Sequence, residues 1–402
     1  MEVLPTVHDG REMFVLRDPE GIIDESSLVV SREVLFVISL MDGTRSVRDI
    51  QEAYMRASGG LLYTDHIISV IEALDGRFLL HNGRYEDRLA TLRAACDAEP
   101  FRTSFLAGRS YPGDEAELRA FMEAMIKGRQ GQAGEQHLLG IIAPHIDYGR
   151  GSEVYRQTYR HLPEKDNTLF VIFGTCHKPA PRMWNISLKD LVTPLGRVRG
   201  PGEVARLVRE DPVLKGYVDE WPHRNEHSIE LQLPIIQFLA GGKEFEVLSV
   251  LTGSLHEYMG DGERPDEGEA ADLVGRLKGL LRAQGGPCVF VAAADLAHIG
   301  AQFGDPPPLD RFMLEESKRK DEVLLRAVAE VDGAGFFETV RKEGDRRRIC
   351  GLAPIYFLLS MLDPCRGQVV GYQQWTDGAS SVSFAGAIFY RDGFEGQSLT
   401  PR

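Results

Sequence analysis

The chain has 402 residues, with 46 Lys and Arg against 60 Asp and Glu, so its formal net charge is −14 at pH 7. Hydrophobic residues make up 43% and charged residues 26%, an ordinary globular composition that excludes a disordered or fibrous chain. The acidic balance also argues against a nucleic-acid-binding protein, which needs a basic surface. The length predicts two or three domains.

The location of the protein is predicted from what the chain lacks. Its first residues show no basic segment followed by an apolar run, and its longest apolar runs fall far short of the roughly 20 residues of a membrane span. The five cysteines are scattered, with no CxxC pair, which is typical of reduced proteins. We therefore predict a cytoplasmic protein that binds neither nucleic acid nor membrane.

Residues 1–95 are predicted to form a small winged-helix-like domain. Helical patterns cover Ser31–Met41, a stretch from Thr44 with Ser46 as N-cap, and His66–Leu74. The segment Arg77–Tyr85 reads as a β-hairpin around Asn82-Gly83, a strong turn signal. Three helices followed by a hairpin are the order of a winged helix.

Charge separates this first domain from the DNA-binding winged helices. Residues 1–97 contain ten Arg, no Lys and seventeen acids, a net charge of about −7. The stretch from Ser31 to Leu80 resembles instead the PqqD-type winged helix, a peptide-recognition element found beside radical-SAM enzymes. The resemblance implies a peptide or protein ligand for this domain. An accessory domain without a ligand is the alternative.

From Leu138 onward, short apolar runs alternate with helical patterns. This alternation predicts an α/β fold with a mixed sheet covered by helices on both faces. The runs predicted as strands are Leu138–Ala143, Leu169–Phe173, Phe245–Leu251, Val289–Ala294, Val369–Trp375 and Val382–Tyr390. The predicted helices include Gly151–His161, Glu203–Arg209, Ser228–Leu239, Ala270–Ala283, Leu314–Val331 and Pro354–Leu362.

Polar residues follow several of these runs, where ligands bind in α/β sheets. His145, His177 and the pair Asp295 and His298 come directly after strands, and Cys350 precedes a helix. Two histidines with one anionic ligand suit a divalent transition metal that keeps open positions. Because no local HxxxH or CxxC spacing is present, the ligands of such a metal would have to come from separate strands.

Collinear motifs in this second part of the chain resemble the Memo family, also called AmmeMemoRadiSam system protein B. They are Ala107-Gly108-Arg109-Ser110-Tyr111-Pro112, Ala143-Pro144-His145 with Tyr148, Gly174-Thr175-Cys176-His177, Asp190 with Thr193-Pro194-Leu195-Gly196, Glu226-His227-Ser228-Ile229-Glu230-Leu231, Asp295-Leu296-Ala297-His298, and Cys350-Gly351 with Pro354-Ile355. The resemblance covers residues 100–392. It implies a fold similar to that of the class III extradiol dioxygenases.

The resemblance also implies a set of site residues and partners. Its metal-ligand positions fall on His145, His177 and Cys350. Fe(II) is the implied metal, with Cu or Zn as alternatives. The implied partners are a radical-SAM enzyme and an AMMECR1-like protein.

Four further residues match the family's catalytic positions. Asp295 and His298 match its further active-site pair, with His298 near the general base of the dioxygenases. Glu226 and His227 match another signature of the family.

One departure bears on the reaction. Cys350 stands where a true extradiol enzyme has a carboxylate, and a thiolate that faces O₂ is readily oxidised, which argues against ring cleavage. Cys350 can be a ligand, a buried thiol, or a nucleophile with His298 or His177 as its base. Three functions follow: a metal-dependent redox enzyme, a non-catalytic peptide-binding protein with a dioxygenase-like cleft, or a Cys-dependent hydrolase.

Overall fold

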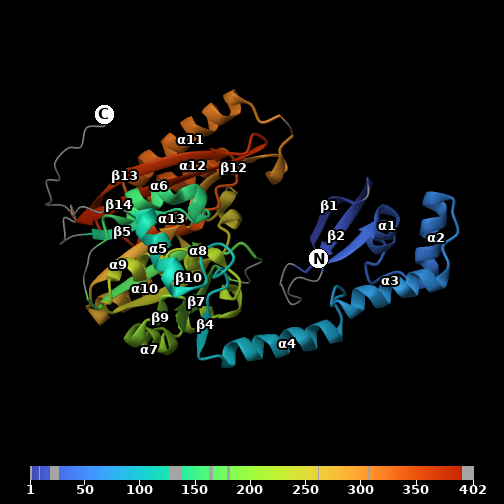
Figure 1. The fold of residues 1–402 in the computed structure, drawn as a ribbon, viewed down its shortest axis with the longest axis horizontal. Helices are drawn as coiled ribbons and strands as arrows, with labels where there is room; N and C mark the ends of the chain where they lie inside the picture. The colour runs from blue at the N-terminus through green and yellow to red at the C-terminus, as the bar shows by residue number, and fades with distance from the viewer. Residues whose placement is uncertain are drawn as a thin grey trace. The chain divides into compact units, whose positions relative to one another are not determined.

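The computed structural model describes residues 2–8, 10–18, 27–126, 138–162, 166–178, 182–260, 262–306 and 308–391. The chain divides into two compact units, Met1–Ala98 and Glu99–Arg402. Each unit has β-sheet of its own (Figure 1). Each also has its own hydrophobic core. No helix of the described residues is both long and apolar enough to cross a membrane.

The first unit combines a three-stranded antiparallel sheet with helices. The sheet has the order β1-β2-β3. Its elements are β1 (Glu2–His8), β2 (Arg11–Arg17), β3 (Leu28–Ser31), α1 (Arg32–Ser39), α2 (Val47–Ser58), α3 (Thr64–Gly76) and α4 (Gly83–Ala98). Ser46 and Asp49 form a reciprocal capping box at the start of α2, so the predicted cap at Ser46 is confirmed.

The predicted hairpin at Arg77–Tyr85 is wrong. Gly83 begins α4, and the side-chain oxygen of Asn82 accepts a hydrogen bond from the backbone N–H of Tyr85 at 3.1 Å. Asn-Gly is a turn signal, but Asn is also among the best helix N-cap residues, and here the second property decides. Without the predicted wing, the winged-helix assignment of residues 1–95 stays a prediction.

The second unit is built on a mixed sheet of eight strands, as its apolar runs predict. The strand order is β12-β14-β5-β11-β6-β10-β7, and β13 pairs with β14. The strands are β5 (Leu138–Ala143), β6 (Thr168–Thr175), β7 (Trp184–Ser187), β10 (Phe245–Thr252), β11 (Cys288–Ala293), β12 (Asp295–Gly300), β13 (Cys365–Thr376) and β14 (Ser380–Arg391). The second unit also has a small three-stranded sheet, made of β4 (Phe101–Thr103), β8 (Asp190–Thr193) and β9 (Gly196–Val198).

Helices cover both faces of the large sheet (Figure 1). Alternate residues of β6 show this directly, because Val171 and Phe173 belong to one core cluster while Phe170 and Ile172 belong to the other. Helices on the first face are α7 (Gly202–Glu210), α10 (Gly268–Gln284), α11 (Arg311–Ala329), α12 (Gly333–Lys342) and α13 (Leu352–Met361). Those on the second are α5 (Glu115–Ile126), α6 (Tyr148–Tyr159), α8 (His227–Glu230) and α9 (Leu233–Ala240).

The central strands β5, β11, β6 and β10 run parallel, so their carboxyl ends meet at one edge of the sheet. This is the edge at which ligands bind in α/β proteins. His145 follows β5 by two residues, and His177 follows β6 by two. The fold therefore brings residues that are 32 positions apart in sequence to one place.

Candidate metal centre

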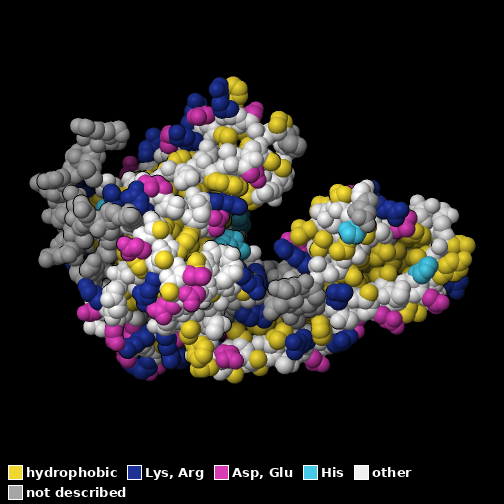
Figure 2. Space-filling model, viewed as in Figure 1, with side chains coloured by type: hydrophobic (Ala, Val, Ile, Leu, Met, Phe, Trp, Pro, Cys, Tyr) yellow, Lys and Arg dark blue, Asp and Glu magenta, His cyan; other side chains and the backbone are white. Residues whose placement is uncertain are grey.

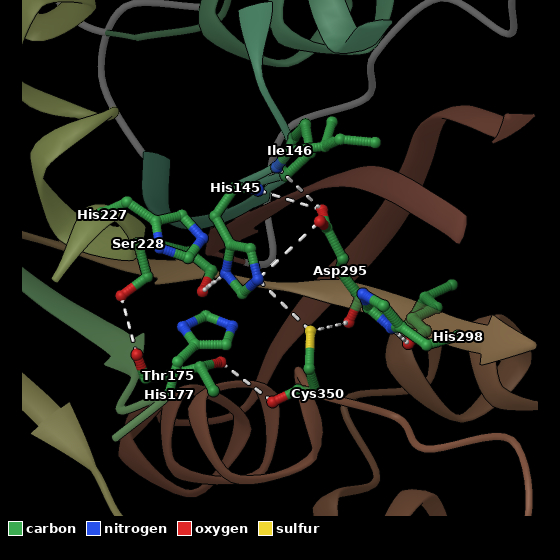
Figure 3. A network of polar contacts seen from close by, with 12 residues as sticks. His145, Ile146, Thr175, His177, His227, Ser228, Asp295, His298 and Cys350 are labelled. Atoms are coloured by element: carbon green, nitrogen blue, oxygen red, sulfur yellow. Dashed lines mark hydrogen bonds and ion pairs between the residues drawn. The ribbon is translucent and has the colours of Figure 1, made fainter. Parts of the chain in front are cut away.

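The residues predicted for the site converge at this edge of the sheet (Figure 3). Two overlapping groups of side chains can offer ligands to a metal, and within each group the ligand atoms lie within 4.8 Å of one another. The first group is His145, His177 and Cys350, and the second is His177, Glu226 and His227. Because His177 belongs to both groups, the site is one continuous cluster.

His145 is the buried centre of the cluster. It has 2% of its surface exposed, and its Nδ1 lies 2.9 Å from the carbonyl oxygen of Ala293. Its Nε2 lies 3.3 Å from the sulfur of Cys350. Burial, together with the nearby His177 and His227, holds the pKa of His145 well below its usual range, so the ring is neutral and its free nitrogen can donate a lone pair.

Glu226 orients two imidazole rings at once. Its Oε1 lies 3.0 Å from Nδ1 of His177 and 3.2 Å from Nδ1 of His227. The two rings stack at 4.4 Å between centroids with an interplanar angle of 24°. Both side chains are about one-third exposed, at 36% and 37%, whereas the Glu226 side chain is 2% exposed. The pair of rings therefore forms the solvent-facing part of the site.

Both carboxylate oxygens of Glu226 accept hydrogen bonds from the backbone. As the N-cap of α8 it accepts from the backbone N–H groups of His227 and Ser228, and its second oxygen accepts from the backbone N–H of His177. Burial would raise its pKa, but the hydrogen bond and charge of His177 lower it well below its usual range. Glu226 therefore serves the site as a charged group that orients the ring of His177.

Close packing of α8 against β6 delivers this carboxylate to the site. A Cβ at Gly174 would lie 2.6 Å from the side chains of both Ser228 and Ile229, so only glycine permits the approach. The hydroxyl of Ser228 donates to the carbonyl of Thr175 at 2.9 Å. These contacts fix Glu226 beside the end of β6.

Cys350 enters the cluster from a loop that precedes α13. Its sulfur lies 3.7 Å from the carbonyl oxygen of Asp295, and its own carbonyl accepts from the Thr175 hydroxyl at 2.9 Å. A Cβ at Gly351 would lie 2.3 Å from the same Asp295 oxygen. Burial, with Asp295 nearby, raises the pKa of the Cys350 thiol well above its usual range.

Asp295 and His298 lie on the edge strand β12. The Asp295 carboxylate accepts from the backbone N–H of His145 at 3.0 Å and lies 3.7 Å from its Nε2. Burial raises the pKa of Asp295 to about 7. No hydrogen bond of the described residues joins Asp295 to the His298 ring.

His298 is held by other contacts. Its Nδ1 lies 3.1 Å from the carbonyl oxygen of Leu296, and its ring packs edge-on against Phe303 at 5.0 Å between centroids. Burial lowers the pKa of His298 below its ordinary value. Its ring is therefore a neutral side chain next to the cluster and outside both ligand groups.

The donor set fits a transition metal. In metal proteins, a ligating histidine usually gives its second ring nitrogen to a carbonyl or a carboxylate. His145 meets this condition through Ala293 and His177 through Glu226, so Nε2 is the nitrogen of each ring that remains to ligate a metal. Two imidazoles and a thiolate suit iron, copper or zinc better than magnesium or calcium.

One sequence motif is structural. The buried carboxylate of Glu230 accepts from the backbone N–H groups of Phe105 and Leu106 and from the hydroxyl of Tyr111, all within 2.8 Å. Tyr111, in the stretch 107–112, thus helps to anchor Glu230 at the end of α8. Glu230 lies four residues after the orienting Glu226. Thr175 and Gly351 belong to sequence motifs, but their contacts with Cys350 and Asp295 join distant segments and are not visible in the sequence.

Comparisons with known proteins agree with this architecture. A family model described as "Memo-like protein" matches residues 102–388. A MEMO1 family protein of Aquifex aeolicus is 27% identical over 384 residues, which cover 94% of this chain and 96% of the relative. Since only 6% of the chain lies outside this match, the Aquifex protein has a counterpart to most of the first unit.

Two further proteins extend the comparison. The MEMO1 family protein TTHA0924 of Thermus thermophilus is 29% identical over 342 residues, covering 83% of this chain and 94% of the relative. A crystal structure of the uncharacterised protein JW3007 from Escherichia coli K12 is 10% identical, covers 62% of this chain and 99% of its own, and has a TM-score of 0.38. A likeness at that level carries no argument.

Proposed function

Because this chain belongs to the Memo-like family, we propose that it is a metal-dependent redox protein whose iron or copper ion is held by His145, His177 and Cys350. The observation that carries the proposal is that the ligand atoms of these three residues lie within 4.8 Å of one another. A metal bound there would supply one-electron chemistry and open positions for a substrate.

The other site residues receive roles from their contacts. Glu226 orients the His177 and His227 rings, and His227, at the solvent-facing side, can bind or orient a substrate. Asp295 fixes the backbone of His145. His298 is the candidate for moving protons, as a neutral ring next to the cluster.

Partners and location complete the proposal. We propose a cytoplasmic protein that acts with a radical-SAM enzyme and an AMMECR1-like protein. For the first unit we propose a peptide or protein ligand. Exposed apolar side chains on α2, α3 and the loop between them support this ligand, since such patches mark interaction surfaces (Figure 2). They are Met55, Leu61, Tyr63 and Ile68.

A Cys-dependent hydrolase is the second candidate. The 3.3 Å contact between the Cys350 sulfur and Nε2 of His145 is the thiol–imidazole arrangement that such an enzyme needs. Burial opposes it, because it raises the pKa of the thiol and so disfavours the nucleophilic thiolate.

Metal analysis of the full-length protein, purified without oxygen, tests the proposal. Near-stoichiometric iron or copper is expected in the wild type, with loss in His145→Ala and Cys350→Ala. His81→Ala and Cys288→Ala are matched controls, because neither residue belongs to the two ligand groups. Wild-type protein without bound metal, or variants that retain it, would overturn the metal function. Metal-free protein whose Cys350 reacts rapidly with a thiol reagent would favour the hydrolase.

A further inference from the structure

The segment that carries Cys350 runs along the outer side of β12, which is an edge strand of the sheet. The backbone N–H of His298 donates to the carbonyl of Arg347 at 2.7 Å, and the N–H of Gly351 donates to the carbonyl of Asp295 at 3.0 Å. These two bonds tie the segment to the strand that holds Asp295 and His298. The position of the sulfur therefore depends on how firmly the segment is held there.

Arg348 adds a side-chain link between the same two elements. One of its terminal nitrogens, Nη1, donates to the carbonyl of His298 at 3.1 Å. Its guanidinium also meets both carboxylate oxygens of Asp305, at 3.1 and 2.6 Å. Asp305 in turn accepts from the backbone N–H of Gly300, at the end of β12. A bidentate Arg–carboxylate pair is both strong and specific in direction.

The backbone of this segment has an unusual conformation. Arg348 has a φ of +51° and Asp345 a φ of +45°, in the left-handed region that non-glycine residues rarely adopt. Such conformations persist only where surrounding contacts hold them, and they concentrate at functional sites. The Arg348 pair is one of those contacts, and it lies two residues before the sulfur ligand.

Arg347 and Arg348 do different things. The Arg347 side chain is 7% exposed and bonds to Asp321 and Glu343 inside the unit, so its loss would disturb the core. The Arg348 side chain is 40% exposed and that of Asp305 is 22% exposed, so this pair can be removed without opening the core. Neither Arg348 nor Asp305 belongs to the ligand groups.

We propose that Arg348 and Asp305 are positioning residues of the metal centre. Their ion pair holds the carbonyl of His298 and the end of β12 against the segment that leads to Cys350. It thereby sets the sulfur in place relative to His145 and His177. The proposal rests on the proposed metal function.

Cobalt(II) titration of the full-length protein under anaerobic conditions tests this role, with the metal alone as the probe. Arg348→Gln is expected to weaken Co(II) binding by about 10-fold, the lower end of the range for groups that bond directly to a ligand, because Arg348 acts through the backbone of the Cys350 segment. Its sulfur-to-cobalt absorption band should weaken or shift. Asp305→Asn should act in the same direction with a smaller effect. Arg348→Lys, a point charge without the fork, should resemble the glutamine variant.

Arg276→Gln is the matched control, because Arg276 is a partly exposed arginine that pairs with Asp272 and Asp211. It should leave affinity and spectrum unchanged. A folded Arg348→Gln or Asp305→Asn protein with wild-type affinity and an unchanged band overturns the positioning role. Failure of the wild type to bind cobalt, iron or copper overturns the proposed function instead.

Discussion

The site has two halves, one around the buried carboxylate of Glu226 and one around that of Asp295. The pKa of the first carboxylate is lowered and that of the second is raised. Glu226 lies among histidine rings and backbone N–H donors, and its pKa is lowered because His177 outweighs the effect of burial. Asp295 meets the backbone N–H groups of His145 and Ile146, and burial raises its pKa to about 7. The surroundings of Glu226 therefore favour its charged form, whereas burial favours the protonated form of Asp295.

This difference indicates how the site is divided. The Glu226 half fixes ring orientation at the side that solvent reaches. The Asp295 half holds the buried His145 and the partly buried Cys350, and a metal cation there would add positive charge beside the Asp295 carboxylate. Replacing the Glu226 carboxylate by an amide should thus change the stability of the fold in the opposite direction to the same replacement at Asp295.

The largest effect is expected from removing a ligand. His145→Ala or Cys350→Ala should weaken iron or copper binding by more than about 100-fold, beyond the range of outer-shell changes. His227→Ala should weaken it much less, since His227 lies outside the Cys350 group. Equilibrium dialysis with metal analysis measures all three. Equal losses in the three variants would contradict the division of the site into halves.

The opposite acidities predict opposite pH effects on the stability of metal-free protein. Glu226, with a lowered folded pKa, contributes stability that is present above about pH 4.5 and is lost as pH falls further. Asp295, with a raised folded pKa, keeps its proton when the unfolded chain has released it, so its burial costs stability as pH rises from about 4 to 7.

Urea unfolding at several pH values measures both effects. Glu226→Gln should be destabilised at pH 7, and its difference from the wild type should begin to narrow as the pH falls below about 4.5. Asp295→Asn should gain stability relative to the wild type between pH 4 and 7, by up to about 4 kcal/mol at the upper end. Shifts of the same sign in both variants would show that the two carboxylates are equivalent.

Metal affinity should itself depend on pH. Burial raises the pKa of the Cys350 thiol, and a metal binds the thiolate, so binding releases a proton. We expect affinity to rise by at least about tenfold per pH unit between pH 6 and 8, because Cys350 releases one proton and His177, whose pKa Glu226 raises against the effect of burial, releases a second where it is still protonated. Competition with a chelator of known pH dependence measures the slope. A flat profile in this window would exclude Cys350 as a ligand.

The smallest effect on metal binding is expected from His298→Ala. His298 lies on the same strand as Asp295 but bonds to neither the Asp295 carboxylate nor Cys350, so affinity should change by less than about threefold. A redox activity that depends on proton transfer should fall much further in the same variant. A large loss of metal would instead place His298 among the ligands.

The sequence predicts the strands of the second unit well because central parallel strands are continuous apolar runs. Leu138–Ala143 is correct at both ends, and Phe245–Leu251 misses one residue. The prediction fails where one signal has two uses, as at Asn82-Gly83, which caps a helix. It also misses the hairpin of β1 and β2, whose exposed residues alternate weakly between apolar and polar.

Sequence motifs predict which residues belong to the candidate site, but they do not predict which of these residues contact each other. Asp295 and His298 stand three positions apart, which suggests one working pair, yet Asp295 contacts His145, 150 positions away. The bonds that link Arg348 to His298 and Asp305 join segments about 50 and 43 positions apart. No periodicity or local spacing records such contacts, because they depend on the register of β12 against a loop.

Gly351 sets a limit on how this protein can change over evolution. Every substitution there adds at least one carbon, which would lie 2.3 Å from the Asp295 carbonyl oxygen. A single mutation can therefore displace the sulfur while every ligand residue remains in the sequence. A survey of relatives that counts only histidines and cysteines would score such a chain as intact, although its centre could no longer assemble.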